Sequence, residues 1–140
     1  MMKLDFAFIC DYAEVTGKIN ALGIGFDTIY AAKLPTKHRL FFFVAQLRTS
    51  TVEAGEKKLE VNLIDDNGHD VVTPIRGALN MPRPKDGAES VTRVAMEFGN
   101  VEFTKYGSYS LRLAVDGIEL VDVPFKVNSP PAAPPPSVSA

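Results

Sequence analysis

The sequence predicts an all-β protein, namely an immunoglobulin-like or related antiparallel β-sandwich of about eight strands. Several short runs alternate apolar and polar residues with a period of two, as strands with one buried face do. Turn dipeptides, Asn67-Gly68 and Asp116-Gly117, separate such runs. The nearest window of helical period, Val52 to Leu63, contains Gly55 and alternates strictly, so a strand is favoured there too.

Length and composition indicate one domain with a short tail. The chain has 140 residues, of which 46% are hydrophobic, and this is an ordinary composition for a soluble globular domain. We expect the domain to span residues 1–128. Residues 129–140 are rich in Pro, Ala and Ser and cannot bury enough apolar surface to offset their ordering entropy, so we expect a disordered tail.

Charge and cysteine usage limit the partners and the compartment. The net charge is −2, without a basic patch, so we expect neither a nucleic-acid partner nor a membrane partner. Cys10 is the single cysteine, which excludes an intrachain disulfide and favours a reducing compartment. Asp5 and Asp11 bracket an apolar run that is too short for a secretory signal, so we expect a cytoplasmic protein.

The first third of the chain predicts two strands and a connection. Leu4, Phe6, Phe8 and Cys10 alternate with other residues, and this stripe is expected to face the core. Gly17-Lys18 forms a turn, after which Ile19–Phe26 returns as a second strand that Gly23 and Gly25 loosen. Residues 27–38 form a connection with room for one helical turn from Thr28 to Leu34, before Pro35.

The middle of the chain predicts four more strands. Leu40–Leu47 is the most apolar run, and it is aromatic and β-branched, so it is expected to be a central strand. Lys57–Asp65 alternates cleanly. A shorter strand covers Ile75–Met81, and Val91–Phe98 follows after a proline-containing loop.

The closing segment, 106–127, is a β-hairpin with two possible registers. A two-residue Asp116-Gly117 loop sets Leu111 opposite Asp122 and wastes the apolar face. A three-residue loop with Gly117 in the left-handed conformation sets Leu111 opposite Val121 and Tyr109 opposite Val123. Burial favours this second register.

Two residues of the hairpin carry further predictions. Pro124 lacks a ladder donor and points to the polar face, which suits an edge strand. Gly107-Ser108-Tyr109 at the start of the penultimate strand resembles the tyrosine corner of immunoglobulin-like sandwiches.

The two ends of the domain resemble a known family. Residues 8–13 read Phe-Ile-Cys-Asp-Tyr-Ala, residues 17–23 read Gly-Lys-Ile-Asn-Ala-Leu-Gly, and the Gly-x-Tyr to Asp-Gly end completes the pattern. This chain is similar to a family of small uncharacterised bacterial proteins that form a domain of unknown function. The resemblance implies a β-sandwich and transfers no activity and no functional residues.

The acidic turn supplies a candidate metal site. Asp65, Asp66 and Asp70 flank Asn67-Gly68, and a two-residue turn sets Asp65 opposite Asp70, a repulsion that Ca²⁺ would relieve. A three-residue loop instead places Asp65 opposite His69 and leaves a solvated turn. The spacing does not fit an EF-hand, so no metal site is assigned beyond this calcium candidate.

Catalytic and binding motifs are sparse. Cys10 could be a nucleophile paired with His38 or His69, but its place in the apolar stripe favours an inert buried thiol. We assign no catalytic residue, and we expect no enzyme activity and no cofactor.

Four strand-end residues are candidates for binding. Asp11 and Tyr12 follow the first strand, and Asp27 and Tyr30 follow the second, so they form a polar and aromatic patch if those ends lie together. Tyr with Asp suits a sugar or a peptide, whereas the plainer interpretation is ordinary strand-end chemistry. The tail contains a PxxP match at residues 131–134, either a ligand for another domain or a passive sequence.

The functional hypothesis follows from architecture rather than from motifs. We expect a non-catalytic protein-interaction or scaffold module, whose partner is another protein or a second copy that pairs with an edge strand. The alternative is a small-ligand or carbohydrate-binding module that uses strand-end loops.

Overall fold

The computed structural model describes residues 2–50, 54–85 and 88–131, which form ten β-strands and, among the described residues, no helix. No helical segment of membrane-spanning length and hydropathy therefore occurs in this part of the chain. The strands are β1 (Lys3–Cys10), β2 (Tyr12–Val15), β3 (Ile19–Leu22), β4 (Thr28–Tyr30), β5 (Thr36–Thr49), β6 (Gly55–Asp65), β7 (Ile75–Met81), β8 (Ser90–Phe103), β9 (Gly107–Val115) and β10 (Ile118–Asn128).

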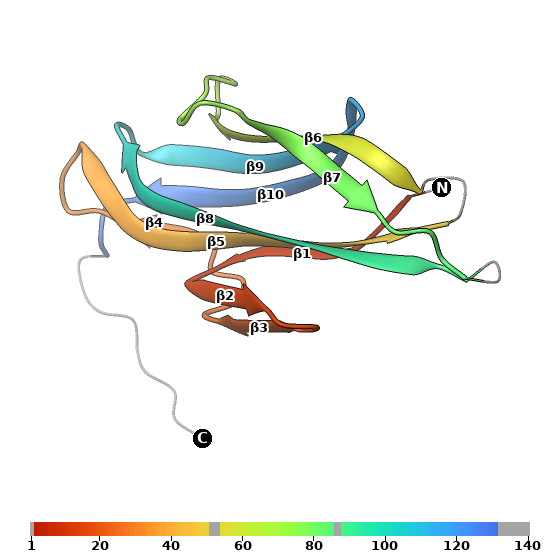
Figure 1. Cartoon of the computed structure of the whole chain (residues 1–140). Coiled ribbons are helices and arrows are strands. Elements are labelled where there is room, and N and C mark those ends of the chain that lie inside the picture. The colour runs from red at the N-terminus through yellow and green to blue at the C-terminus, as the bar shows by residue number, and fades with distance from the viewer. Residues whose placement is uncertain (1, 51–53, 86–87, 132–140) are drawn as a thin grey trace.

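The strands form three sheets (Figure 1). A three-stranded sheet has the order β1-β5-β8, and a five-stranded sheet has the order β4-β10-β9-β6-β7. Their inner faces enclose one hydrophobic core, in which the largest fully buried side chains include Phe41, Phe43, Phe103 and Leu111. The third sheet is the β2-β3 hairpin, which lies against the side of β1-β5-β8 that faces away from the five-stranded sheet (Figure 1).

The all-β prediction is confirmed, but the strand count and arrangement differ from it. Two short strands were not expected. Residues 12–15 pair with β3 as β2, and residues 28–30 form β4 in place of the helical turn expected from Thr28 to Leu34. β4 forms because it pairs in parallel with residues 126–128 of β10, and no local pattern of the sequence reveals this pairing.

The closing hairpin has the two-residue turn and not the three-residue loop that burial favoured. Val115 lies opposite Ile118, and both turn residues have positive φ, +50° for Asp116 and +80° for Gly117, as a type I′ turn requires. Asp116 is held in this conformation by β6. Its backbone N–H donates to the Lys58 carbonyl at 2.8 Å, and its carboxylate accepts the Lys58 N–H at 2.8 Å.

This turn alone would set apolar residues of β9 opposite polar residues of β10, and a β-bulge restores the apolar pairing. The register shifts between Glu119 and Val121, after which Leu111 lies opposite Val123 and Tyr109 opposite Phe125. The predicted pairs, Leu111 with Val121 and Tyr109 with Val123, are therefore wrong by two residues. Both registers put the same residues of β9 inward, so alternation alone could not separate them.

The predicted edge position of the last strand is only partly right. β10 pairs with β9 along its length, while β4 covers the other side at residues 126–128 alone. Pro124 is exposed and precedes the residues that pair with β4, where no ladder donor is needed. The corner geometry expected of Tyr109 is present, because its hydroxyl donates to the carbonyl of Lys105 at 2.6 Å.

Candidate functional site

The first strand turns its aromatic residues outward, contrary to the expectation that they face the core. A bulge shifts the register between Leu4 and Phe6, so that Phe6 lies opposite Gln46 and Phe8 opposite Val44. Directly opposed residues share a face of the sheet, and the intervening Ala7 and Ile9 oppose Ala45 and Phe43 of the main core. Phe6 and Phe8 therefore lie on the outer face, where their rings stack at 5.9 Å between centroids.

Polar contacts made by the bulged residue hold this register. The Asp5 carboxylate accepts a hydrogen bond from Gln46 Nε2 at 2.8 Å and forms an ion pair with Arg48 Nε at 2.8 Å. Gln46 in turn accepts from Arg93 Nε at 3.0 Å. The bulge leaves Asp5 without a partner in the ladder. In return the Asp5 side chain joins a connected row of polar residues on the outer face, beside Phe6.

The β2-β3 hairpin covers only one end of this outer face. Cys10 and Val44 are buried beneath it together with Ala13 of the hairpin itself, and partly buried residues pack around them: Phe8, Ile19, Ala21 and Phe42. We call these seven residues the hairpin cluster. Tyr12 meets Phe42 edge to face at 5.2 Å between centroids. The cluster is a second, smaller core outside the main one.

Backbone geometry closes the hairpin onto the sheet. Asp11 N–H donates to the Leu22 carbonyl at 3.0 Å, and Gly25 N–H donates to the Ile9 carbonyl at 2.8 Å. Gly23 between them has φ of +66°, and a Cβ there would overlap the Asp11 carboxylate. The glycine predicted to loosen a strand instead allows the chain to leave the hairpin in close contact with Asp11.

Between the uncovered part of β1 and the hairpin lies an open groove of about 780 Å³. We call it the aromatic groove. Its apolar members are unusually accessible, since Phe6 is 38% exposed, Tyr12 46%, Ile24 60% and Leu22 69%. The lining residues are Phe6, Phe8, Tyr12, Glu14, Ile19, Asn20, Ala21, Leu22 and Ile24.

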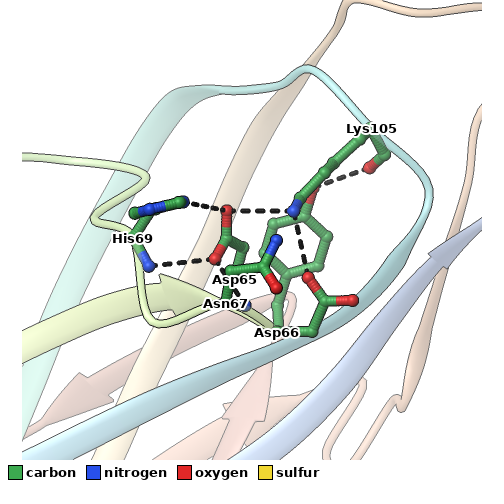
Figure 2. A network of polar contacts seen from close by, with 6 residues as sticks. Asp65, Asp66, Asn67, His69 and Lys105 are labelled. Atoms are coloured by element: carbon green, nitrogen blue, oxygen red, sulfur yellow. Dashed lines mark hydrogen bonds and ion pairs between the residues drawn. The ribbon is translucent and has the colours of Figure 1, made fainter.

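The acidic turn between β6 and β7 has the three-residue geometry. Asp65 N–H donates to the His69 carbonyl at 3.0 Å, and Gly68, with φ of +79°, donates its N–H to the Asp65 carbonyl at 3.1 Å. The Asp65 carboxylate accepts the backbone N–H groups of Asn67 and His69, both at 2.9 Å (Figure 2). The turn is therefore an Asx-type turn that satisfies its own carboxylate.

An ammonium group occupies the place proposed for calcium. Lys105 Nζ lies 3.2 Å from Asp65 Oδ2 and 3.0 Å from Asp66 Oδ1 (Figure 2). Asp70 belongs to a separate bridge, opposite Ile64. No cluster of three or more His, Cys, Asp or Glu side chains able to hold a metal ion occurs within residues 2–50, 54–85 and 88–131.

Ionisation within this turn follows from its contacts. The backbone N–H of His69 is the main cause that lowers the pKa of Asp65, and Lys105 lowers it further. Hydrogen bonds to Asp66 and then Asp65 raise the pKa of Lys105. Both shifts favour the charged pair, which is the signature of a structural ion pair rather than of an acid or base poised for catalysis.

Cys10 is buried in the hairpin cluster, as expected of an inert thiol. Its Sγ contacts the Tyr12 carbonyl at 3.5 Å, and burial is the main cause that raises its pKa. A nucleophilic thiolate requires the opposite shift. His69 belongs to the turn between β6 and β7. His38 packs between Phe26 and Phe41, and burial lowers its pKa.

Two of the four strand-end candidates line two different hollows, and the other two line neither of them. Tyr12 lines the aromatic groove. Asp27 lines a different hollow, of about 330 Å³, together with Thr28, Ser108 and Lys126. Asp11 lies at the base of the hairpin against Gly23, and Tyr30 is 60% exposed on β4. Of the PxxP match, residues 132–134 lie outside the described residues.

Sequence reasoning missed the groove because it assigned Phe6 and Phe8 to the core. A signal was present: two stripes of β1 are apolar, since Ala7 and Ile9 alternate with Phe6 and Phe8. A strand with apolar residues on both faces is buried on both sides or meets something on its second face. Glu14, Asn20 and Leu22 belong to no recognisable sequence motif, so no pattern singled them out.

Comparison with known proteins confirms the general resemblance. A family model described as a family of unknown function, DUF6941, matches residues 5–128. None of the curated proteins compared matches the chain.

A solved structure similar to this chain is that of the Pseudomonas fluorescens alkylpurine DNA glycosylase AlkC bound to DNA containing an abasic site analog. The identity is 11% and the TM-score 0.48, and the match covers 91% of this chain but 30% of that one. The matched protein holds DNA, which is at odds with two expectations, a protein-interaction module and no nucleic-acid partner, and we do not carry these two expectations further. At this TM-score the likeness supports no argument about what this chain binds.

Proposed function

We propose that this chain, which belongs to the family of unknown function DUF6941, binds a ligand with a planar aromatic ring in the aromatic groove, without chemically changing it. The observation that carries the proposal is the stacked pair of Phe6 and Phe8 on the outer face of β1, in which Phe8 packs against the hairpin cluster and Phe6 stays exposed beside it. A ring placed against such a pair gains both apolar burial and aromatic contact.

The exposure of this surface supports a binding role. Single exposed apolar residues are ordinary on protein surfaces, but Phe6, Tyr12, Leu22 and Ile24 line one hollow. Covering apolar area stabilises a complex by about 25 cal/mol per Å² before the cost of association is subtracted. A ligand that covers these side chains therefore gains several kcal/mol of gross binding energy, on the order of that for burying two or three apolar side chains.

The site differs from the strand-end loops of the sequence-based hypothesis. It is built on a sheet face and a hairpin, whose geometry the ladder hydrogen bonds fix. Sites on strands hold a ligand in a more defined orientation than sites on loops do.

Three finer expectations accompany the proposal. We propose that the fold is a variant of the immunoglobulin-like sandwich, an inference that the Tyr109 corner supports. We propose a bacterial and cytoplasmic protein, supported by the resemblance of residues 8–23 and by the free thiol of Cys10. We propose one domain that ends near residue 128, where β10 ends.

The test is a titration with N-phenyl-1-naphthylamine, an uncharged probe with two aromatic ring systems. We expect saturable binding to the wild type, and at least a tenfold loss of affinity in the double variant Leu22→Asp/Ile24→Asp, because charges replace two exposed apolar contacts. Both positions are exposed, so the fold should tolerate the change.

The matched control is Ile118→Asp. Ile118 is 66% exposed, like Leu22 and Ile24, but it lies at the turn between β9 and β10. Its probe affinity should equal that of the wild type. Absence of probe binding, or equal affinity in all variants, would disprove the proposed site.

A further inference from the structure

The aromatic groove also carries a polar pair at a defined place. Glu14 lies opposite Asn20 in the β2-β3 ladder, and Tyr12 lies opposite Leu22 two residues along each strand. Both pairs occupy the same exposed face of the hairpin, about 7 Å apart along the strands. All four residues line the groove, so one fused ring system can contact the apolar pair and the polar pair together.

The chemistry of the pair is asymmetric. An ionised carboxylate only accepts hydrogen bonds, and it accepts two parallel N–H groups well. An amide both donates and accepts, and Asn20 Nδ2 lies 3.3 Å from Thr16 Oγ1, a contact that limits the rotation of the amide. The groove therefore presents a double acceptor beside a donor, next to aromatic rings.

We infer that the aromatic groove recognises a guanine-type ring, with Glu14 accepting the two adjacent N–H donors of its edge, Asn20 at the neighbouring carbonyl, and the aromatic side chains of the groove holding its faces. This rests on the proposed function, because it names the ligand class of the same groove. Guanine carries two adjacent donors next to an acceptor. Adenine and cytosine place a ring acceptor beside their amino group, and uracil has one donor between two acceptors, so the Glu14 carboxylate meets a lone pair in each of them.

The charge of Glu14 also bears on the form of the ligand. A carboxylate in the groove disfavours a nearby phosphate, so guanosine should bind more tightly than its 5′-monophosphate. The same edge is available on a free nucleoside and on an unpaired guanine in a single strand. Guanosine and a single-stranded oligothymidylate with one central guanine distinguish these two sources.

The experiment measures binding of the four common ribonucleosides, inosine and the oligonucleotide to the full chain by calorimetry, together with displacement of N-phenyl-1-naphthylamine. We expect guanosine to bind at least tenfold more tightly than adenosine, cytidine or uridine. Inosine, which lacks the exocyclic amine, should bind several-fold more weakly than guanosine.

The variant that isolates the edge contact is Glu14→Gln, which puts a donor where guanine also donates. It should weaken guanosine binding at least tenfold and leave the urea midpoint of unfolding unchanged. Glu56→Gln, an exposed carboxylate on β6, is the matched control and should change neither.

Two failures are distinguishable. If the probe binds in the groove but neither guanosine nor the oligonucleotide does, or all nucleosides bind equally and Glu14→Gln changes nothing, the guanine inference is wrong and the ring-binding function stands. If neither probe nor nucleoside binds, both are wrong.

Discussion

The outer faces of the two large sheets are built on different principles. On the five-stranded sheet, charged side chains pair across strands: Arg112 lies 3.5 Å from both Glu119 and Asp122, and Arg76 lies 3.6 Å from Glu60. On the three-stranded sheet, a polar row occupies one end, and stacked aromatic rings and a hairpin occupy the rest. Both faces lie outside the main core. The charged face satisfies its side chains with ion pairs and water, whereas the other face leaves apolar side chains exposed to water.

The difference teaches where binding energy is available. Exposed ion pairs contribute roughly 0–1 kcal/mol each and leave little to gain from a partner. Exposed apolar surface gains free energy whenever something covers it. The hairpin covers Cys10 and Val44 in this way, but Phe6 keeps its exposure. The outer face of the three-stranded sheet is therefore the one on which we expect a ligand to bind and to cover apolar surface.

The largest expected effect comes from displacing the β2-β3 hairpin, which covers part of the outer face of the three-stranded sheet. Gly23→Ala places a Cβ against the Asp11 carboxylate at a φ of +66°, so the hairpin must shift. We expect the free energy of unfolding to fall by about 2–3 kcal/mol. Labelling of Cys10 by a thiol reagent under native conditions should accelerate about tenfold, because the thiol loses its cover.

The control for this change is Gly17→Ala in the turn of the same hairpin. Gly17 has a similar φ, +74°, but a Cβ there meets no atom within 4 Å. It should cost about 1 kcal/mol of backbone strain and leave Cys10 labelling slow. Equal losses in the two variants would show that contact with Asp11 is unimportant for the hairpin.

A medium effect is expected inside the five-stranded sheet, at Tyr109, whose ring is buried in the main core. Tyr109→Phe removes the hydroxyl that donates to the Lys105 carbonyl at 2.6 Å and leaves that carbonyl without its donor. Urea denaturation should show a loss of about 1–2 kcal/mol, with probe binding in the aromatic groove unchanged. Tyr30→Phe, at an exposed position on β4, should stay within about 0.5 kcal/mol of the wild type, and a similar value for both would argue against the corner bond.

The smallest effect concerns the Asp65 ion pair, and its sign depends on pH. Because the folded-state pKa of Asp65 is lowered, its ionisation stabilises the fold at pH values above the unfolded pKa, and this contribution disappears as pH falls through the lowered value. Asp65→Asn should therefore be less stable than the wild type at pH 7, and the difference should shrink in acid.

Urea midpoints at pH 7 and in acid, below the folded pKa of Asp65, test this dependence. Asp70→Asn, in the same acidic turn but outside the Lys105 network, is the matched control and should change the midpoint less at neutral pH. A deficit of Asp65→Asn that stays constant across pH would contradict a charge-based role.

Strands with strong local alternation could be predicted from sequence. β7 has the predicted bounds, β6 begins two residues before the predicted Lys57, and Leu40–Leu47 and Val91–Phe98 lie within β5 and β8. β6 and β8 have one buried face, so period and burial agree there, whereas β5 is buried on both faces around Val44 and was predicted from its continuous apolar run. The three-residue geometry of the acidic turn is one of the two alternatives that the sequence offers, and the position of Gly68 is consistent with it.

The candidate site could not be predicted, because long-range contacts create it. The bulge that turns Phe6 outward is held by Gln46 and Arg48, more than forty residues away in the chain. The bulge after Glu119 likewise accompanies the two-residue turn, in which Asp116 is hydrogen-bonded to Lys58 of β6. A one-residue shift reverses every side chain beyond it, so the face of β1 depended on partners that local reasoning does not contain.

The pairing of β4 with β10 has a consequence for how the molecule assembles. β4 spans Thr28–Tyr30, and its partners are Lys126–Asn128, nearly one hundred positions later. Closing such a distant pair is slow relative to forming neighbouring hairpins, because chain entropy must be lost before the contact forms. During synthesis β1 can join β5 early, whereas β4 waits for the last strand to leave the ribosome. A nascent chain stalled before residue 126 should therefore expose β4 to proteases and chaperones.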